Sequence, residues 1–459
     1  METTVFAVAG IAASFLAIFL VVVGWRLSSR FWISVSTSTA PFQIFSFPLG
    51  TVYLPVSLLT ALAAFPRTGW SNLFRQAKWP RYVVVILAMQ FISIAWSSEP
   101  ALGIRYIGYE LPLLFVFMGF AAYAAEQPAQ ATRWACRIFM LACATSAFVI
   151  FFRFSPGLEA AYLSSPLARI LISPNVLLDP STLNVNDPAK AGGLFFVNAN
   201  PGAAFYGFCA VSTWYLGRIT GSRSAGPLAI LAWVATLLSG SKAGLMAAVA
   251  VPAAIALIVF ASSRRLKAAY LITGALLTAV FVAAIPWLLP IVNSQDQAFA
   301  AESVATLNTR LVMWNYAAKA FAAHPLLGQG FGGWDAGFCP IAYFSGIDCF
   351  PPHNALVILW SQSGIVAAIA GALFAGSVLL SGIRAATQTT GPTSMLGYAI
   401  FGGCAWLFGQ AMGENFGLFG ETHVTPLLGM MLGLLSGIRE ASGLSEYIRA
   451  VDTRSIGHK

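Results

Sequence analysis

Residues 353–380 read HNALVILWSQSGIVAAIAGALFAGSVLL and contain no Asp, Glu, Lys or Arg. A helix that spans a bilayer needs roughly 17–25 mostly apolar residues, so this stretch predicts a membrane helix. Comparable runs, some of them short, are 5–24, 48–65, 81–96, 103–124, 134–154, 195–217, 226–239, 242–261, 268–291, 394–412 and 422–438. The sequence therefore predicts an all-α polytopic membrane protein with about 12 transmembrane helices.

The composition excludes a water-soluble globule. The 459-residue chain is 58% hydrophobic and only 9% charged, whereas soluble domains carry about 25% charged residues. The net charge of +9 could suggest a nucleic-acid partner, but that needs a clustered basic face. Here the Lys and Arg residues are spread over short loops, so we expect membrane lipids and no nucleic acid as partners.

The loop charges predict an orientation in the bacterial inner membrane. If the loop with Arg67, Arg75, Lys78 and Arg81 is cytoplasmic, most of the 25 Lys and Arg residues fall on that side. Such an excess is typical of cytoplasmic loops. Residues 5–24 lack a basic flank before them and are interpreted as a retained helix. Both termini are then cytoplasmic, although Arg26 and Arg30 disagree and leave the first hairpin open.

Two long polar segments, 155–194 and 293–352, fall on the predicted periplasmic side. Loops of this length are usually functional or disordered. The second contains an amphipathic pattern that predicts a short helix on the membrane surface, formed by Arg310, Met313, Trp314, Ala317 and Phe321. We therefore divide the chain into N-terminal transmembrane helices (1–94), a transmembrane core (95–292), a large periplasmic loop (293–352), and C-terminal transmembrane helices with a cytoplasmic tail (353–459).

Residues 308–365 hold the most informative motifs. They begin NTRLVMWNYAAKAFAAHPLLGQGFGGWDAGF and end PPHNALVILWSQSGI, with ten residues between His353 and Gly364. Upstream lie AWSSEPALGIR (95–105), GLFFVNANPGAA (193–204) and LLSGSKAGLMA (237–247). In this order the four segments resemble the superfamily of O-antigen ligases and of O-antigen and exopolysaccharide polymerases. One departure is Lys242, where the family usually has Arg; Lys keeps the charge but not the bidentate fork.

The resemblance implies a GT-C-like glycosyltransferase with its active site facing the periplasm. The implied donor is an undecaprenyl-diphosphate-linked glycan, and the implied acceptor is lipid A-core or a second lipid-linked repeat unit. Transfer would be inverting, without metal or cofactor, in lipopolysaccharide O-antigen or exopolysaccharide biosynthesis. The sequence does not separate ligase from polymerase. A transporter or flippase of lipid-linked glycans is the alternative, but we find no internal repeat with paired broken helices.

The implied chemistry assigns roles to four residues. A diphosphate leaving group requires cations, so we predict that Arg310, Lys242 and Arg105 bind it and that Arg310 also assists catalysis. His353 is the predicted catalytic base. It follows two prolines, in the predicted first turn of a helix, where the helix N-terminus favours its neutral form. The alternatives are a headgroup-binding Arg310, a topology anchor at Lys242 and an Arg105–Glu110 ion pair.

Further candidates surround these residues. Trp314, Trp334, Asn354 and His423 are possible contacts of sugar or acceptor, although the tryptophans could be interfacial anchors and Asn354 could brace a helix start. No Asp-x-Asp or His/Cys cluster predicts a metal site. Cys339 and Cys349 lie in one loop in an oxidising compartment and predict a disulfide that clamps the approach to His353; two free thiols are the alternative.

Overall fold

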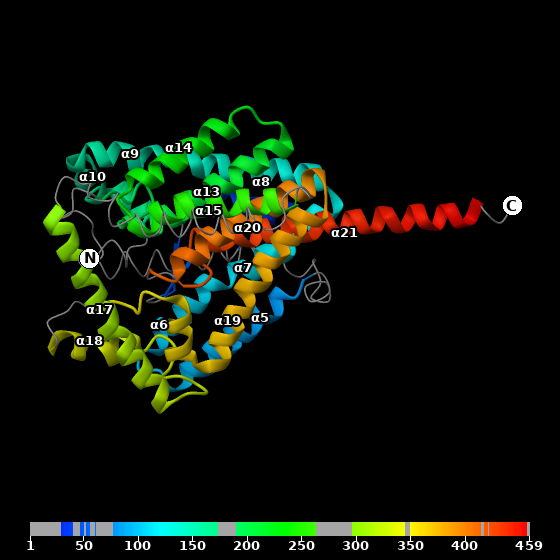
Figure 1. Cartoon of the computed structure of the whole chain (residues 1–459). Helices are drawn as coiled ribbons and strands as arrows, with labels where there is room; N and C mark the ends of the chain where they lie inside the picture. Colours follow the sequence, from blue (N-terminus) through cyan, green and yellow to red (C-terminus); the bar gives the residue numbers. More distant parts are fainter. Residues whose placement is uncertain are drawn as a thin grey trace.

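The computed structural model describes residues 29–39, 46–49, 52–55, 60, 77–172, 190–262, 296–344, 349–414, 417–420 and 422–456. This part of the chain is almost entirely helical (Figure 1). Within the described residues, five helices are long and apolar enough to cross a membrane: Trp79–Trp96, Pro100–Glu126, Pro128–Phe154, Lys242–Phe260 and Ala355–Gln388. The chain is thus a helical, multi-pass membrane protein. The runs 5–24 and 268–291 lie outside the described residues, so the number of twelve helices stays a prediction.

The described helices follow the apolar runs predicted between 81 and 261 and between 353 and 438. Several begin with proline, which suits a first helical turn because the missing N–H is not needed there. The elements are α2 (Ser29–Thr39), α5 (Trp79–Ser93), η3 (Ile94–Trp96), α6 (Pro100–Glu110), α7 (Pro112–Glu126), α8 (Pro128–Thr145), α9 (Ala147–Phe154), α10 (Pro156–Leu163), α11 (Pro166–Leu171), α13 (Ala199–Thr220), α14 (Ala225–Leu238), α15 (Lys242–Ser262), α17 (Asp296–Ala323), α18 (Trp334–Phe344), α19 (Ala355–Gln388), α20 (Gly391–Ala411) and α21 (Val424–Ile456).

The core is formed by helices that pack in pairs: α7 on α21, α13 on α20, and α19 on both α5 and α20. The α7–α21 pair is the tightest, because α21 presents a glycine every fourth residue. A Cβ atom at Gly429 would lie 2.6 Å from the carbonyl oxygen of Leu113, and one at Gly437 only 2.3 Å from that of Ala121. Such small residues let membrane helices approach backbone to backbone.

The two ends of the bundle differ in charge. α19 runs from the end that holds His353 to the end that holds Arg384, where Arg439 donates to the carbonyl of Ser381. α7 runs in the same direction as α21 and ends there too, at Glu126, which is ion-paired with Arg30. Arg30, whose side the sequence left open, therefore lies at the same end of the bundle as Arg384 and Arg439.

Three predicted elements differ in detail. The run 48–65 begins not as a helix but in an antiparallel pair of strands, β1 (Ser46–Leu49) and β2 (Val52–Pro55). The run 103–124 is split between α6 and α7 at Pro112, which cannot donate a helical hydrogen bond. The short amphipathic helix at 310–321 is part of the much longer α17.

A buried carboxyl group ties α10 to the segment before α13. Glu159 Oε1 accepts from the backbone N–H of Gly192 at 3.1 Å, and burial raises the pKa of Glu159 although this bond acts in the opposite direction. Because folding raises the pKa of this carboxyl, the protein loses stability as the pH rises through that pKa and Glu159 becomes ionised.

The variant Glu159→Gln keeps the hydrogen-bond acceptor but removes the charge. It should raise the thermal unfolding midpoint at neutral pH and match the wild type at mildly acidic pH, whereas Glu159→Leu should lower it at both.

Candidate functional site

Three elements close on the turn that follows α20, residues 412–414, which we name the α20 turn. Arg310 of α17 donates from Nη2 to the carbonyl of Gly413 at 2.8 Å. Asn354 donates to the carbonyl of Met412 at 3.1 Å, and Asn200 of α13 donates to Glu414 Oε2 at 2.7 Å. Chain segments more than 200 residues apart therefore meet at one point.

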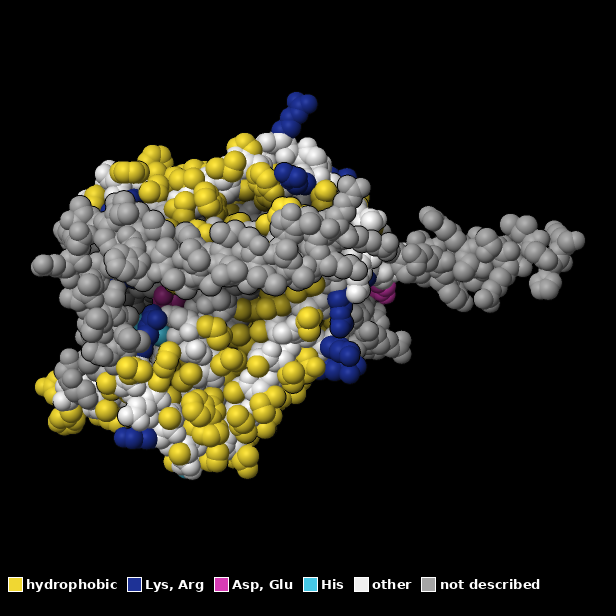
Figure 2. Space-filling view, viewed as in Figure 1, with side chains coloured by type: hydrophobic (Ala, Val, Ile, Leu, Met, Phe, Trp, Pro, Cys, Tyr) yellow, Lys and Arg dark blue, Asp and Glu magenta, His cyan; other side chains and the backbone are white. Residues whose placement is uncertain are grey.

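Arg310 keeps capacity to bind an anion. Its Nε atom is buried and has no hydrogen-bond partner, although a guanidinium offers five N–H donors. Figure 2 shows a hollow at the left of the view where basic, acidic and histidine side chains meet on a largely apolar and neutral surface. A buried donor without a partner is costly, so this position fits a negatively charged ligand.

His353 lies beside Glu414 in a strained conformation. Its Nδ1 is 3.9 Å from Glu414 Oε2 and makes no hydrogen bond. Among the described non-glycine residues, it alone has a positive φ, of 49°. Such strain, about 1–3 kcal/mol, persists only where the surrounding structure imposes it, often at functional sites.

α19 begins after His353, not at it. Asn354 is the N-cap, and its Oδ1 accepts from the N–H groups of Leu356 and Val357. The prediction that His353 occupies the first helical turn is therefore wrong, because the cap leaves it outside the helix. Asn354 uses its amide oxygen and nitrogen for backbone contacts, which favours bracing of the helix start over contact with sugar.

Two tryptophans hold the loop that leads to His353. Trp314 donates from Nε1 to the carbonyl of Pro352 at 2.8 Å, and Trp334 donates to that of Phe350 at 2.9 Å. Trp334 is only 3% exposed and packs against Tyr316 and Phe338. This burial leaves no face of Trp334 for a sugar ring and makes both indoles supports of the loop.

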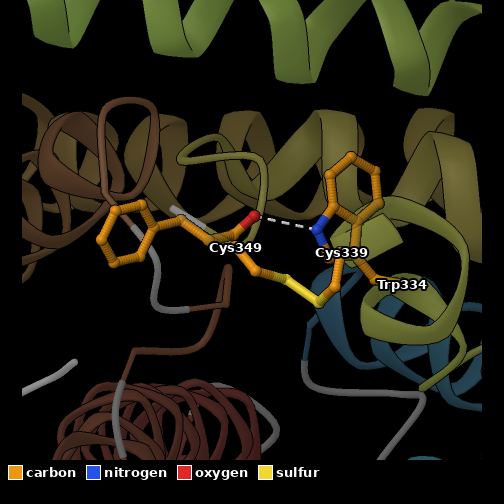
Figure 3. Close-up of a disulfide and its surroundings, with 4 residues drawn as sticks. Trp334, Cys339 and Cys349 are labelled. Carbon is orange, nitrogen blue, oxygen red and sulfur yellow. Dashed lines mark hydrogen bonds between the residues drawn. A yellow bond between two sulfur atoms is a disulfide. The ribbon is translucent and has the colours of Figure 1, made fainter. Parts of the chain in front are cut away.

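A disulfide joins Cys339 of α18 to Cys349 beside the Trp334–Phe350 hydrogen bond (Figure 3). The Cα atoms are 4.9 Å apart. The two cysteines and Asp335 form the described cluster that could hold a metal ion, but a disulfide leaves neither sulfur as a thiolate ligand. The crosslink therefore fixes the middle of α18 against the loop to His353.

Removing this crosslink should weaken the protein. By chain entropy a closed loop of this size contributes about 3 kcal/mol, so Cys339→Ser with Cys349→Ser should lower the unfolding midpoint. Thermal unfolding and thiol counting by mass spectrometry on oxidised protein check this. Reductant should lower the unfolding midpoint of the wild type to that of the double variant and should leave the midpoint of the double variant unchanged. A wild type with two further reactive thiols would contradict the pairing.

The glycine-rich segment HPLLGQG packs across a break in α19. The N–H groups of Gln329 and Gly330 donate to the carbonyls of Ser361 and Gln362, and the N–H of Ile365 donates to that of Pro325. These bonds satisfy backbone groups that the break would leave unpaired. Gly364 has φ 86°, and a Cβ there would lie 2.0 Å from the carbonyl oxygen of Leu326. Only glycine fits this crossing.

The same segment contacts the stretch 95–105. Trp96 donates to the carbonyl of Gly328 at 3.1 Å. A Cβ at Gly332 would lie 2.5 Å from the nitrogen of Gly103, and one at Gly103 would lie 2.5 Å from the carbonyl oxygen of Phe331. These contacts bring α6, and with it Arg105, against the segment that follows α17.

Arg105 lies on α6 and Lys242 begins α15, so both come from other helices than Arg310. The Nε of Arg105 has no partner, and no ion pair joins Arg105 to Glu110, so the alternative of that structural pair is wrong. Lys242 begins α15, where a Cβ at Gly244 would lie 2.6 Å from the Cβ of Ala203, one helical turn after Asn200. All three cations therefore belong to one end of the bundle.

The remaining histidines differ from His353. His423 is 3% exposed and stacks on Phe195, with ring centroids 5.3 Å apart, which favours a role in the core over contact with an acceptor. His324 is exposed, and its carbonyl accepts from Gly328 in the turn. Sequence reasoning gave no role to Gly413 or to the Asn200–Glu414 bond, because no spacing in the sequence links them.

A scan against protein-family models matches residues 227–372 to Wzy_C, described as O-antigen ligase. The matched range includes Lys242, Arg310, the disulfide, His353 and the break at Gly364. No curated protein matches the chain. The match confirms the resemblance predicted from the sequence: residues 227–372 of this chain are similar to the Wzy_C family of O-antigen ligases.

Proposed function

We propose that this protein transfers or polymerises a glycan from an undecaprenyl-diphosphate-linked donor at the α20 turn. The observation that carries the proposal is the convergence of Arg310 and His353 on that turn, which itself contributes Glu414. A cation for the leaving group and a base for the acceptor are what such a transfer needs, and both lie within the residues matched to the O-antigen ligase family.

The cations stabilise the leaving group. As the bond between the anomeric carbon and the diphosphate oxygen breaks, the electron pair stays on the diphosphate, and its negative charge grows. Preorganised donors in a site poor in water stabilise developing charge strongly. Arg310 presents its unpartnered Nε for this purpose, and Arg105 and Lys242 add positive charge at the same end of the bundle.

His353 receives the acceptor proton. The acceptor hydroxyl oxygen attacks the anomeric carbon from the face opposite the diphosphate, and the configuration inverts. The hydroxyl proton passes to the imidazole, which Glu414 stabilises once it is protonated. Because Nδ1 faces Glu414, Nε2 is the atom we assign to the proton transfer. The 3.9 Å separation fits a site that tightens when substrate binds.

The acceptor decides between the two activities that share this chemistry. A ligase passes the glycan to lipid A-core, and a polymerase passes it to a second lipid-linked repeat unit. We place either reaction in lipopolysaccharide O-antigen or exopolysaccharide biosynthesis, on the periplasmic side of the inner membrane, and we expect no metal requirement.

Transfer by purified protein tests the proposal. The assay contains an undecaprenyl-diphosphate-linked glycan, EDTA, and either no further acceptor or lipid A-core. The matched variant is His353→Asn, because asparagine tolerates a positive φ better than most residues and removes only the imidazole. We expect wild-type transfer with EDTA present and loss in the variant.

The products distinguish the activities. Elongation of the donor alone identifies a polymerase, and product only with lipid A-core identifies a ligase. Equal rates in wild type and His353→Asn would contradict the role of the base. Movement of donor across liposome membranes without any transfer would favour a transporter.

A further inference from the structure

A second acidic residue, Glu110, lies near the site and has no ionic partner among the described residues. Glu110 ends α6, immediately before the break at Leu111–Pro112. A Cβ at Gly417, three residues after Glu414, would lie 3.7 Å from Glu110 Oε1. The same oxygen accepts from Gln90 Nε2 of α5 at 3.3 Å. Glu110 therefore faces the chain just beyond the α20 turn.

The contact between Gln90 and Glu110 leaves one buried oxygen atom on each side chain without a hydrogen-bond donor. Gln90 is 1% exposed, yet its Oε1 is buried without a hydrogen-bond partner, and so is Oε2 of Glu110. Both atoms accept hydrogen bonds and neither can donate to the other if Glu110 is ionised. One proton on Glu110 supplies the missing donor and lets the carboxylic acid and the amide close a ring of two hydrogen bonds.

Among the described residues, Glu110 has one hydrogen-bond donor and no cation that would stabilise its ionised form. No ion pair joins it to Arg105, the cation on its own helix, and within the described residues its hydrogen bond comes from a neutral amide. A buried charge without a cation or several donors is strongly disfavoured in a protein interior. A buried un-ionised acid bonded to an amide has no such cost.

We propose that Glu110 is un-ionised and forms a cyclic acid–amide pair with Gln90, so that it does not offset the positive charge of Arg105. The pair joins α5 to the end of α6 while adding no negative charge to this end of the bundle. The consequence for the donor rests on the proposed function: an anionic diphosphate then meets Arg105 without a neighbouring carboxylate. The protonation state itself does not depend on that function.

Infrared spectroscopy of the full-length protein in detergent at neutral pH tests the protonation state directly. The wild type should show a carbonyl stretch of an un-ionised carboxylic acid, shifted by deuterium exchange, that disappears in Glu110→Gln. The matched control is Glu126→Gln, because Glu126 is exposed and ion-paired with Arg30; this change should remove a carboxylate band instead. Loss of a carboxylate band in Glu110→Gln overturns the proposal.

A second variant keeps the test decisive if Glu110→Gln does not fold. Gln90→Leu removes the amide, so the acid band of Glu110 should move to the frequency of a free carboxylic acid. An unchanged band overturns the pairing. In the transfer assay the donor KM of Glu110→Gln should equal that of the wild type, whereas a lower KM would reveal a carboxylate that opposed the diphosphate. Failure of all transfer, with the infrared result intact, refutes the proposed function and not this inference.

Discussion

Arg310→Gln should lower the transfer rate by about 10²–10³-fold, the usual loss when one preorganised donor to a developing oxyanion is removed. Glutamine keeps a polar group near the carbonyl of Gly413 but removes the charge and the unpartnered Nε. Because the growing charge of the diphosphate is what Arg310 contacts in the proposal, the loss should fall on kcat more than on the donor KM. Steady-state transfer with a defined lipid-diphosphate donor measures both constants.

Two further variants test whether the loss is specific to the guanidinium of Arg310. Lys319→Gln removes an exposed cation from the same helix and should leave transfer unchanged, which controls for the general basicity of α17. Arg310→Lys keeps the charge but not the planar guanidinium, so its transfer rate should lie between that of Arg310→Gln and that of the wild type. If Arg310→Gln is as active as the wild type while its unfolding midpoint falls, Arg310 only braces the α20 turn.

The helices were predictable because lipid imposes a simple pattern. A membrane helix must be apolar over most of its length, so runs such as 81–96 and 394–412 could be assigned from composition alone. Breaks were harder to predict, because they depend on tertiary contacts. Gly364 lies in an apolar run and interrupts α19 only because the chain at Leu326 crosses there.

The site was predictable only where sequence motifs carried it. Arg310 and His353 stand in motifs that resemble the O-antigen ligase family, and the structure holds both at the α20 turn. Glu414 stands in no such motif, and its contact with Asn200 spans 214 residues. Trp334 could be predicted as aromatic and interfacial, but its burial beside Tyr316 follows from the packing of α18 on α17.

A double-mutant cycle should show that Glu414 acts through His353. We expect His353→Asn to lower kcat by about 10²–10⁴-fold, the contribution of a positioned general base. Glu414→Gln should cost less, because the imidazole remains, and its amide oxygen can still accept from Asn200. Glutamine cannot stabilise the imidazolium that forms when His353 takes the acceptor proton, so this loss should also fall on kcat.

The double variant decides between positioning and independent action. If Glu414 serves only to stabilise and orient His353, adding Glu414→Gln to His353→Asn should cause no further loss, since interacting residues are non-additive. Asn200→Ala is the matched control, because it removes the hydrogen bond to Glu414 Oε2 and leaves both ionisable groups. It should reduce transfer less than Glu414→Gln. Losses that simply multiply in the double variant would mean that Glu414 contacts substrate on its own, and Nδ1 of His353 would then need another partner.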